Sequence, residues 1–322
     1  MKAFVAALFS LLVLGAGAQE TKAQDIKGPI RLVVPYAPGG GAIDLTARGL
    51  QKVMEAKLGV PVIVDNKPGG GTRIGTMNVA NSAPDGTSLL VVSAPGWIGY
   101  YHSGIFEEKV WEVMTPIAQI AESPYSVITV DAKGTIDSWA KVVAKSKETN
   151  KPISGGAPAA GGFTEYAFNQ IMQRSGIKGI FVPYAGAGPA KTALLAGEID
   201  IQMESGQAFL GIRSGQTKGI AISTPERFPL APDIPTYKEL AIGDTLPTNA
   251  FSVWGPKNMD PKVVQKLADA IKAAAEDKPF LDLIQERNAI LVRFTPPDVM
   301  RKELKEIDDV WGDRLRSMLK KK

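Results

Sequence analysis

Three consecutive glycines, Gly39 to Gly41, are the residues of this sequence that most directly suggest chemistry. They follow the apolar run "IRLVVPYAP" and precede a segment whose apolar residues recur at helical spacing from Ile43 to Met54. Glycines let a backbone approach a ligand closely, and the first turn of a helix presents unpaired N–H donors and a partial positive charge. The pattern predicts an anion site built from backbone groups, with tight-turn geometry alone as the alternative.

The glycines do not form a nucleotide-binding fingerprint. A G-x-G-x-x-G motif that started at Gly39 would need glycine at Asp44, and one in the second loop, Gly69 to Gly71, would need glycine at Ile74. No Gly-Lys dipeptide occurs, which excludes a phosphate loop of the Walker type. Asp44 lies in the first helical turn, where its carboxylate would repel an anion. We expect Asp44 to face away and to accept backbone N–H bonds that shape the loop.

Few residues of the chain could act as catalysts. There are no cysteines, and His102, in the loop-like stretch "GYYHSGIF", is the one histidine, so a structural role is favoured over catalysis. No G-x-S-x-G motif is present. Carboxylates in or near the central part of the chain leave a hydrolase or lyase open as an alternative: Asp131, Glu165, Asp200 and Glu204. We expect no catalytic residue, metal or cofactor.

Strands alternate with helices along the chain, which predicts βαβ units and a mostly parallel sheet covered on both faces. The runs "IRLVVPYA", "VPVIVDNKP" and "SLLVVSAP" begin one set of units, and "KPISGG", "KGIFVPYAG", "IDIQMES" and "KGIAIST" belong to a second. Two extended crossings near 123–127 and 248–254 would join them. The predicted first lobe is residues 25–124 plus 250–322, and the second is 125–249.

The N-terminus and the charge balance predict an exported protein. "AFVAALFSLLVLGAG" follows Met1-Lys2 and ends near an Ala-Gly-Ala cleavage site, so residues 1–18 read as a signal peptide. The formal net charge is +4, and the basic residues are dispersed rather than gathered into a stripe, so no nucleic acid partner is expected.

Three long motifs strongly resemble one family. "IRLVVPYAPGGGAIDLTAR", "VIVDNKPGGGTRIGTMNVANSAPDGTSLL" and "FVPYAGAGPAKTALLAGEIDIQ" are similar to the extracytoplasmic solute receptors of tripartite tricarboxylate transporters, the TctC or Bug group of periplasmic binding proteins. The resemblance covers nearly the whole mature chain. It implies a type II periplasmic-binding-protein fold: two α/β lobes joined by two extended crossings, with a ligand cleft between. It also implies a monomeric periplasmic receptor that delivers a small organic carboxylate to the membrane subunits of such a transporter.

The resemblance also implies which residues bind the ligand, largely through backbone amides. The first carboxylate loop would be Tyr36, Ala37, Pro38, Gly39, Gly40 and Gly41, and Ser93 belongs to the same side. The second loop would be Gly161, Gly162, Phe163 and Thr164, with Tyr184, Gly186 and Glu204 in the cleft wall.

The second loop departs from the family pattern. The family has a hydroxyl residue and then a histidine there, whereas "SGGAPAAGGFTEYAF" places Phe163 and Glu165 near those positions. Two interpretations stay open for the ligand: its distal half is apolar, or it carries a hydrogen-bond donor instead of a second carboxylate. Glu165 either selects the ligand or stabilises the helix N-terminus and points to solvent.

Overall fold

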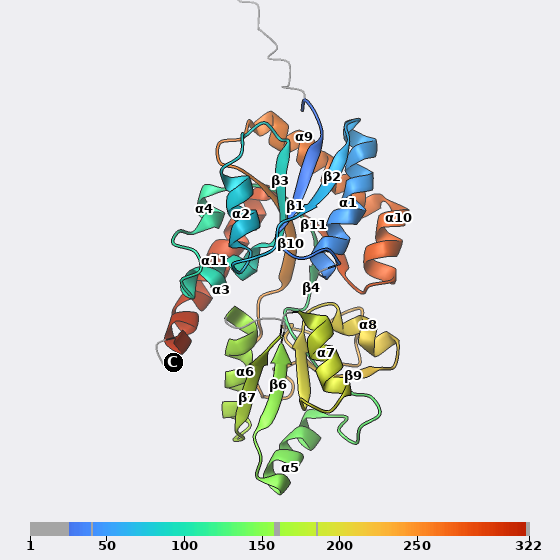
Figure 1. Ribbon diagram of the computed structural model, residues 1–322, viewed down its shortest axis with the longest axis vertical. Coiled ribbons are helices and arrows are strands. Elements are labelled where there is room, and N and C mark those ends of the chain that lie inside the picture. The colour runs from blue at the N-terminus through green and yellow to red at the C-terminus, as the bar shows by residue number, and fades with distance from the viewer. Residues whose placement is uncertain (1–25, 40, 158–161, 185, 320–322) are drawn as a thin grey trace, which may run out of the picture.

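A computed structural model describes residues 26–39, 41–157, 162–184 and 186–319. The predicted signal peptide, residues 1–18, lies outside this part of the chain. Two α/β lobes lie one above the other in Figure 1. The first stretch of the upper lobe contains β1 (Ile30–Val34), α1 (Ala42–Leu58), β2 (Val62–Asn66), α2 (Arg73–Ala80), β3 (Ser88–Ser93), α3 (Ala94–His102), α4 (Val110–Val113) and β4 (Thr115–Ser123).

The lower lobe follows without interruption, and the chain then returns to the upper one. The lower lobe contains β5 (Val127–Asp131), α5 (Trp139–Thr149), β6 (Ile153–Ala157), α6 (Gly162–Arg174), β7 (Gly179–Pro183), α7 (Ala187–Leu195), β8 (Ile201–Glu204), α8 (Ala208–Arg213) and β9 (Thr217–Ile222). The returning stretch contains β10 (Asn249–Gly255), α9 (Pro261–Lys272), the 3₁₀-helix Ala273–Glu276, α10 (Lys278–Leu281), the π-helix Asp282–Glu286, β11 (Leu291–Thr295) and α11 (Pro297–Leu319).

Each lobe is built on one sheet. The upper sheet has the strand order β11-β4-β10-β3-β1-β2, and the lower sheet has the order β7-β6-β8-β5-β9. The chain leaves the upper sheet after Ser123 and enters the lower one at Val127, and it returns between Ile222 and Asn249. These are the two crossings between the lobes.

The prediction of mostly parallel sheets is wrong, because both sheets are mixed. β1 runs parallel to β2 and β3, and β6 runs parallel to β7 and β8, as βαβ units require. β10 is antiparallel to β3 and β4, β11 is antiparallel to β4, and β5 is antiparallel to β8 and β9. The crossings explain the antiparallel pairs β4–β10 and β5–β9, since a strand that enters a sheet beside the one that leaves it runs in the opposite direction.

The apolar core continues from one lobe into the other. Helix α3 and the long α11 of the upper lobe both contact α6 of the lower lobe, and Figure 1 shows α11 reaching down beside α3. Phe163 of α6 is fully buried, with its ring centroid 5.3 Å from that of Trp311 in α11. Gly99 allows α3 to approach closely, because a Cβ there would lie 3.1 Å from the Cα of Gly162.

Candidate ligand-binding site

A cavity of about 530 Å³ lies between the two lobes. The upper lobe contributes the loop after β1, the start of α1, the end of β3, helix α3 and strand β10. The lower lobe contributes the starts of α6 and α7, the end of β8 and the segment after it. The lining residues include Tyr36, Ala37, Gly39, Gly41, Ser93, Tyr100, Tyr125, Gly162, Thr164, Gly186, Met203, Glu204, Gln207 and Asn249.

The loop after β1 leaves the N-terminus of α1 open toward this cavity. Gly41 is the N-cap of α1 and makes no side-chain capping bond, so the helix begins with N–H groups available to a ligand. Its φ of +107° favours glycine. A Cβ at Gly41 would lie 3.2 Å from the Nε2 atom of Gln207 in the other lobe, so the small residue also permits the close approach of the lobes.

Asp44 anchors this loop by hydrogen bonds and is not among the residues that line the cavity. Its carboxylate accepts hydrogen bonds from the Gly39 N–H at 3.0 Å, from Arg48 Nε at 2.9 Å and from Asn66 Nδ2 at 2.8 Å. The Asn66 amide also donates to the carbonyl of Tyr36 at 2.9 Å, which ties the loop to β2. Burial by itself would raise the pKa of Asp44, but the hydrogen bonds outweigh it and the pKa is lowered.

Hydroxyl groups form another part of the upper wall. The Ser93 side chain is buried, and its Oγ has no hydrogen-bond partner among the described residues, so it is free to bond a ligand. Burial raises the pKa values of Tyr36, Tyr100 and Tyr125, which keeps these phenols neutral near neutral pH.

The lower lobe offers helix starts and one carboxyl group. Gly162 is the first residue of α6 and Thr164 lies in the same turn, while Gly186 is the N-cap of α7 and makes no side-chain capping bond. Glu204 is the last residue of β8 and is 5% exposed. Burial raises the pKa of its carboxyl from the ordinary 4.5 to about 8, against the opposing effect of Lys191.

Several predicted site residues lie elsewhere. Gly40 and Gly161 are outside the described part of the chain. Pro38 is exposed and, like Phe163 and Tyr184, does not line the cavity. The Phe163 ring packs behind the wall, 5.0 Å from that of Tyr125 between centroids. Tyr184 packs against a small apolar cluster of Ala193, Leu194 and Ile199.

Glu165 is 5% exposed and lies outside the cavity lining, so the interpretation in which its side chain points to solvent is wrong. Helix geometry separates Glu165 from Phe163 by about 200° around α6, so the Glu165 side chain is buried on a different side of the helix from the Phe163 ring.

The sequence reasoning did not identify Tyr100, Tyr125, Gln207 or Asn249, all of which line the cavity. Tyr125 could have been found, because it is an aromatic residue within the predicted crossing near 123–127. Tyr100 was hidden by the prediction of a loop over "GYYHSGIF", which is wrong for Gly99–His102 because Ala94–His102 is helix α3. Pro95, Gly96 and Gly99 weaken the helical signal in the sequence, whereas packing against α6 and α11 favours the helix.

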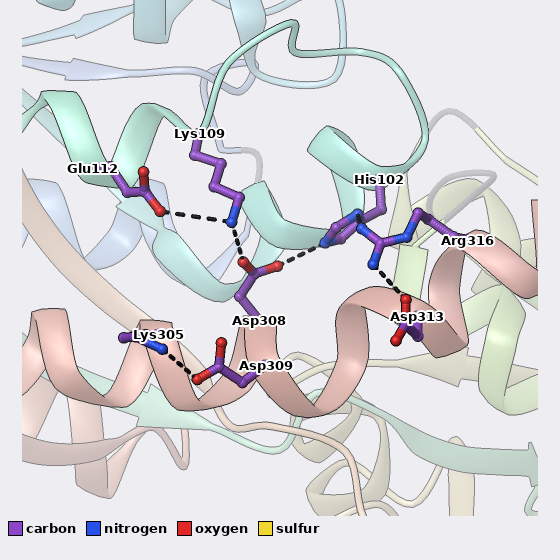
Figure 2. Close-up of polar contacts among 8 residues, drawn as sticks. All are labelled: His102, Lys109, Glu112, Lys305, Asp308, Asp309, Asp313 and Arg316. Atoms are coloured by element: carbon purple, nitrogen blue, oxygen red, sulfur yellow. Dashed lines mark hydrogen bonds and ion pairs between the residues drawn. The ribbon is translucent and has the colours of Figure 1, made fainter.

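His102 links α3 to α11 (Figure 2). It does not line the cavity. Its Nε2 lies 2.7 Å from Asp308 Oδ1, and the other carboxylate oxygen of Asp308 accepts from Lys109 Nζ at 2.8 Å. Arg316 donates to His102 Nδ1 at 3.0 Å. Because arginine can only donate, Nδ1 acts as an acceptor and Nε2 as the donor to Asp308. The side chain is buried and fully engaged, which is a structural role.

The four carboxylates that made a hydrolase or lyase a possible alternative do not form pairs with one another. Asp200 forms an ion pair with Lys145 at 2.6 Å and accepts a bond from the Ser154 hydroxyl. Asp131 accepts from the backbone N–H of Lys133. Of the four carboxylates named above, only Glu204 lines the cavity. Among the described residues, no group of three or more potential metal ligands is found.

Two α/β lobes, two crossings and a cavity between them define a two-lobed solute-binding protein. The family model for the tripartite tricarboxylate transporter family receptor, TctC, matches residues 46–302. Protein BugT of Bordetella pertussis is 32% identical over 271 residues, which cover 83% of this chain and 82% of BugT. The chain therefore belongs to the TctC receptor family, and it is a solute receptor of that group.

Solved structures agree with this family assignment. The periplasmic binding protein BugD is 26% identical, with a TM-score of 0.76 over 89% of this chain and 96% of BugD. MatC of Rhodopseudomonas palustris, solved with bound malate, has a TM-score of 0.76 at 23% identity over 90% of this chain and 99% of MatC, a likeness of fold. Within the described residues, no helix has the length and apolar character needed to cross a membrane.

Proposed function

We propose that this chain binds a small organic carboxylate in the cavity between its lobes. The proposal rests on one observation: uncapped helix N-termini face the cavity, and its described lining contains no cationic side chain. The N-termini of α1 and α7 open at the cavity, and no lysine or arginine is among the described residues that line it. Backbone N–H groups at helix starts bind an anion without a charged partner.

The ligands of structural neighbours support the same class. MatC was solved with malate and a second protein of R. palustris with adipate, and both are carboxylates. The site residues of this proposal are Tyr36, Ala37, Gly39, Gly41 and Ser93 above the ligand, with Gly162, Thr164, Gly186 and Glu204 below it. Asp44 shapes the first loop without touching the ligand.

Export and delivery are part of the proposal. Residues 1–18 act as a cleaved signal peptide, and the mature monomer works in the periplasm. Closure of the two lobes around the ligand, by bending at the two crossings, produces the form that the membrane subunits of a tripartite tricarboxylate-type transporter accept. Membership of the receptor family supports this role and disfavours the hydrolase or lyase alternative.

A melting-temperature screen against carboxylic acids tests the ligand class. A ligand at about 100 times its dissociation constant stabilises the folded state by about 2.7 kcal/mol, which is readily measured. We expect at least one acid to raise the melting temperature, and its methyl ester, which lacks the carboxylate, to have no effect. The proposal fails if no acid shifts the melt and the purified protein carries no acid. Conversion of a stabilising acid into product would instead establish an enzyme.

A further inference from the structure

The described lining of the cavity contains a carboxyl side chain and no cationic side chain, although the proposed ligand is itself an acid. Glu204 is the one residue with a charged side chain among the described residues that line the cavity, and the other polar groups are neutral hydroxyls, amides and backbone N–H groups. A ligand with two carboxylates would therefore bring a second negative charge to a site that has no cationic side chain in its described lining and already contains an acid. When Glu204 is ionised, the two like charges lie side by side and disfavour binding strongly.

The structure fixes the Glu204 carboxyl in place. Its Oε2 accepts from Gln202 Nε2 at 3.0 Å, and the same amide donates to the carbonyl of Ala187 at 3.1 Å. Gln202 thus holds the carboxyl beside the start of α7. No hydrogen bond to Oε1 is found among the described residues, so this oxygen remains available to a ligand. Glu204 faces Val127 of β5 across the sheet, at the crossing between the lobes.

The charges around Glu204 come from few groups. Lys191 of α7 is the cation that favours its ionised form, Gln202 on its own strand is neutral, and Val127 of β5 is apolar. Burial dominates and raises the pKa of Glu204 to about 8. Burial also raises the pKa values of Tyr36, Tyr100 and Tyr125, which opposes ionisation of these phenols as the pH rises. In either protonation state of Glu204, the Oε1 side can accept a hydrogen bond.

We propose that Glu204 determines specificity in the lower half of the site. When ionised, it selects acids whose second polar group is a neutral hydrogen-bond donor, a hydroxyl or an amide N–H, over dicarboxylates of the same skeleton. This inference rests on the proposed carboxylate-binding function and names the ligand class within it. The donor bonds to Oε1, while the single carboxylate of the ligand lies at the helix starts of the other lobe.

Matched pairs of probes test the inference across ligands of several lengths. The pairs are succinate and succinamate, glutarate and glutaramate, adipate and adipamate, and terephthalate and 4-carbamoylbenzoate. Their affinities are measured by titration calorimetry at pH 6.5 and 9.5, where the ligand carboxylates stay ionised. The proteins are the native chain, Glu204→Gln and the control Glu198→Gln. Glu198 is an exposed residue of the same lobe, so its substitution removes the same charge outside the cavity.

For the skeleton that binds best, we expect the mono-amide and the dicarboxylate to bind the native chain with affinities within about 3-fold of each other at pH 6.5, because the protonated Glu204 carboxyl is neutral there and can itself donate to a carboxylate. At pH 9.5 the dicarboxylate requires Glu204 to take up a proton. With a pKa of about 8 for Glu204, its affinity should fall by about 30-fold, whereas that of the mono-amide should hardly change. Glu204→Gln should abolish this dependence on pH, and Glu198→Gln should retain it.

Two results would overturn the assignment of Glu204 alone. One is a dicarboxylate that binds the native chain as tightly as its mono-amide at both pH values, a measurement that needs no variant. The other is a pH-dependent preference that survives in Glu204→Gln. If no acid of the panel binds any of the three proteins, the proposed carboxylate-binding function fails and this inference fails with it.

Discussion

Replacement of Asp44 by alanine should loosen the first ligand loop while the fold survives. The change removes the acceptor of the bonds from the Gly39 N–H, the Asn66 amide and Arg48. Loss of two hydrogen bonds to a carboxylate, partly replaced by water, costs about 2–3 kcal/mol of unfolding free energy. The Arg48 side chain is 46% exposed, so its ion pair adds only about 0.5 kcal/mol.

The same change should also weaken ligand binding, because the loop would be less ordered before the ligand binds. Release of one loop residue means that binding must fix its backbone again, at about 1–2 kcal/mol, which corresponds to about 5- to 30-fold in affinity. The assay is urea unfolding together with calorimetry, using the acid that gives the largest shift in the melting screen. Asp269→Ala is the control, because the carboxylate of that exposed helix residue accepts a bond from the Gln265 amide on the same helix, and the substitution should change stability by less than about 0.5 kcal/mol.

The pH dependence of the unfolding free energy gives a second measurement of how much Asp44 contributes to stability. Because its pKa is lowered in the folded state, its contribution is present above its ordinary value of 3.8 and is lost as the pH falls through the lowered one. The difference in stability between the native chain and Asp44→Ala should therefore be constant from about pH 5 to 8 and shrink in stronger acid. An Asp44→Ala protein with native stability and native affinity would refute the role of Asp44 as a loop anchor.

Two further substitutions test the cavity wall. Gly41→Ala places a Cβ at a φ of +107° and 3.2 Å from Gln207, so it should cost about 1–3 kcal/mol of stability and weaken binding, as measured by unfolding and calorimetry. Gly39→Ala, also at positive φ but with open space around the Cβ, should weaken binding less, and equal losses would exclude the contact between lobes as the cause. Ser93→Ala removes a buried hydroxyl that has no partner among the described residues, so stability should stay within about 0.5 kcal/mol while affinity falls about 5- to 10-fold. Unchanged affinity would remove Ser93 from the ligand contacts.

Much of the fold was predictable because its signals are local. Each predicted β-branched run from "IRLVV" to "KGIAI" contains a strand of the structure, since strand periodicity and glycine punctuation act over a few residues. Strands β4 and β11 and helix α3 were not predicted. The residues of α3 have a weak helical propensity, and its contacts with α6 and α11 come from distant parts of the chain.

Residue types and short spacings were enough to establish the family, the glycine loops and the exclusion of nucleotide and thiol chemistry. Which side chains face the ligand depended instead on how the two lobes pack. That packing turned Phe163 and Tyr184 away from the cavity, brought Gln207 up to Gly41, and isolated Glu204 among neutral groups. Spacing along the chain could not supply these facts, because the direction of a side chain, and the dielectric and charge around it, are set where segments distant in sequence meet.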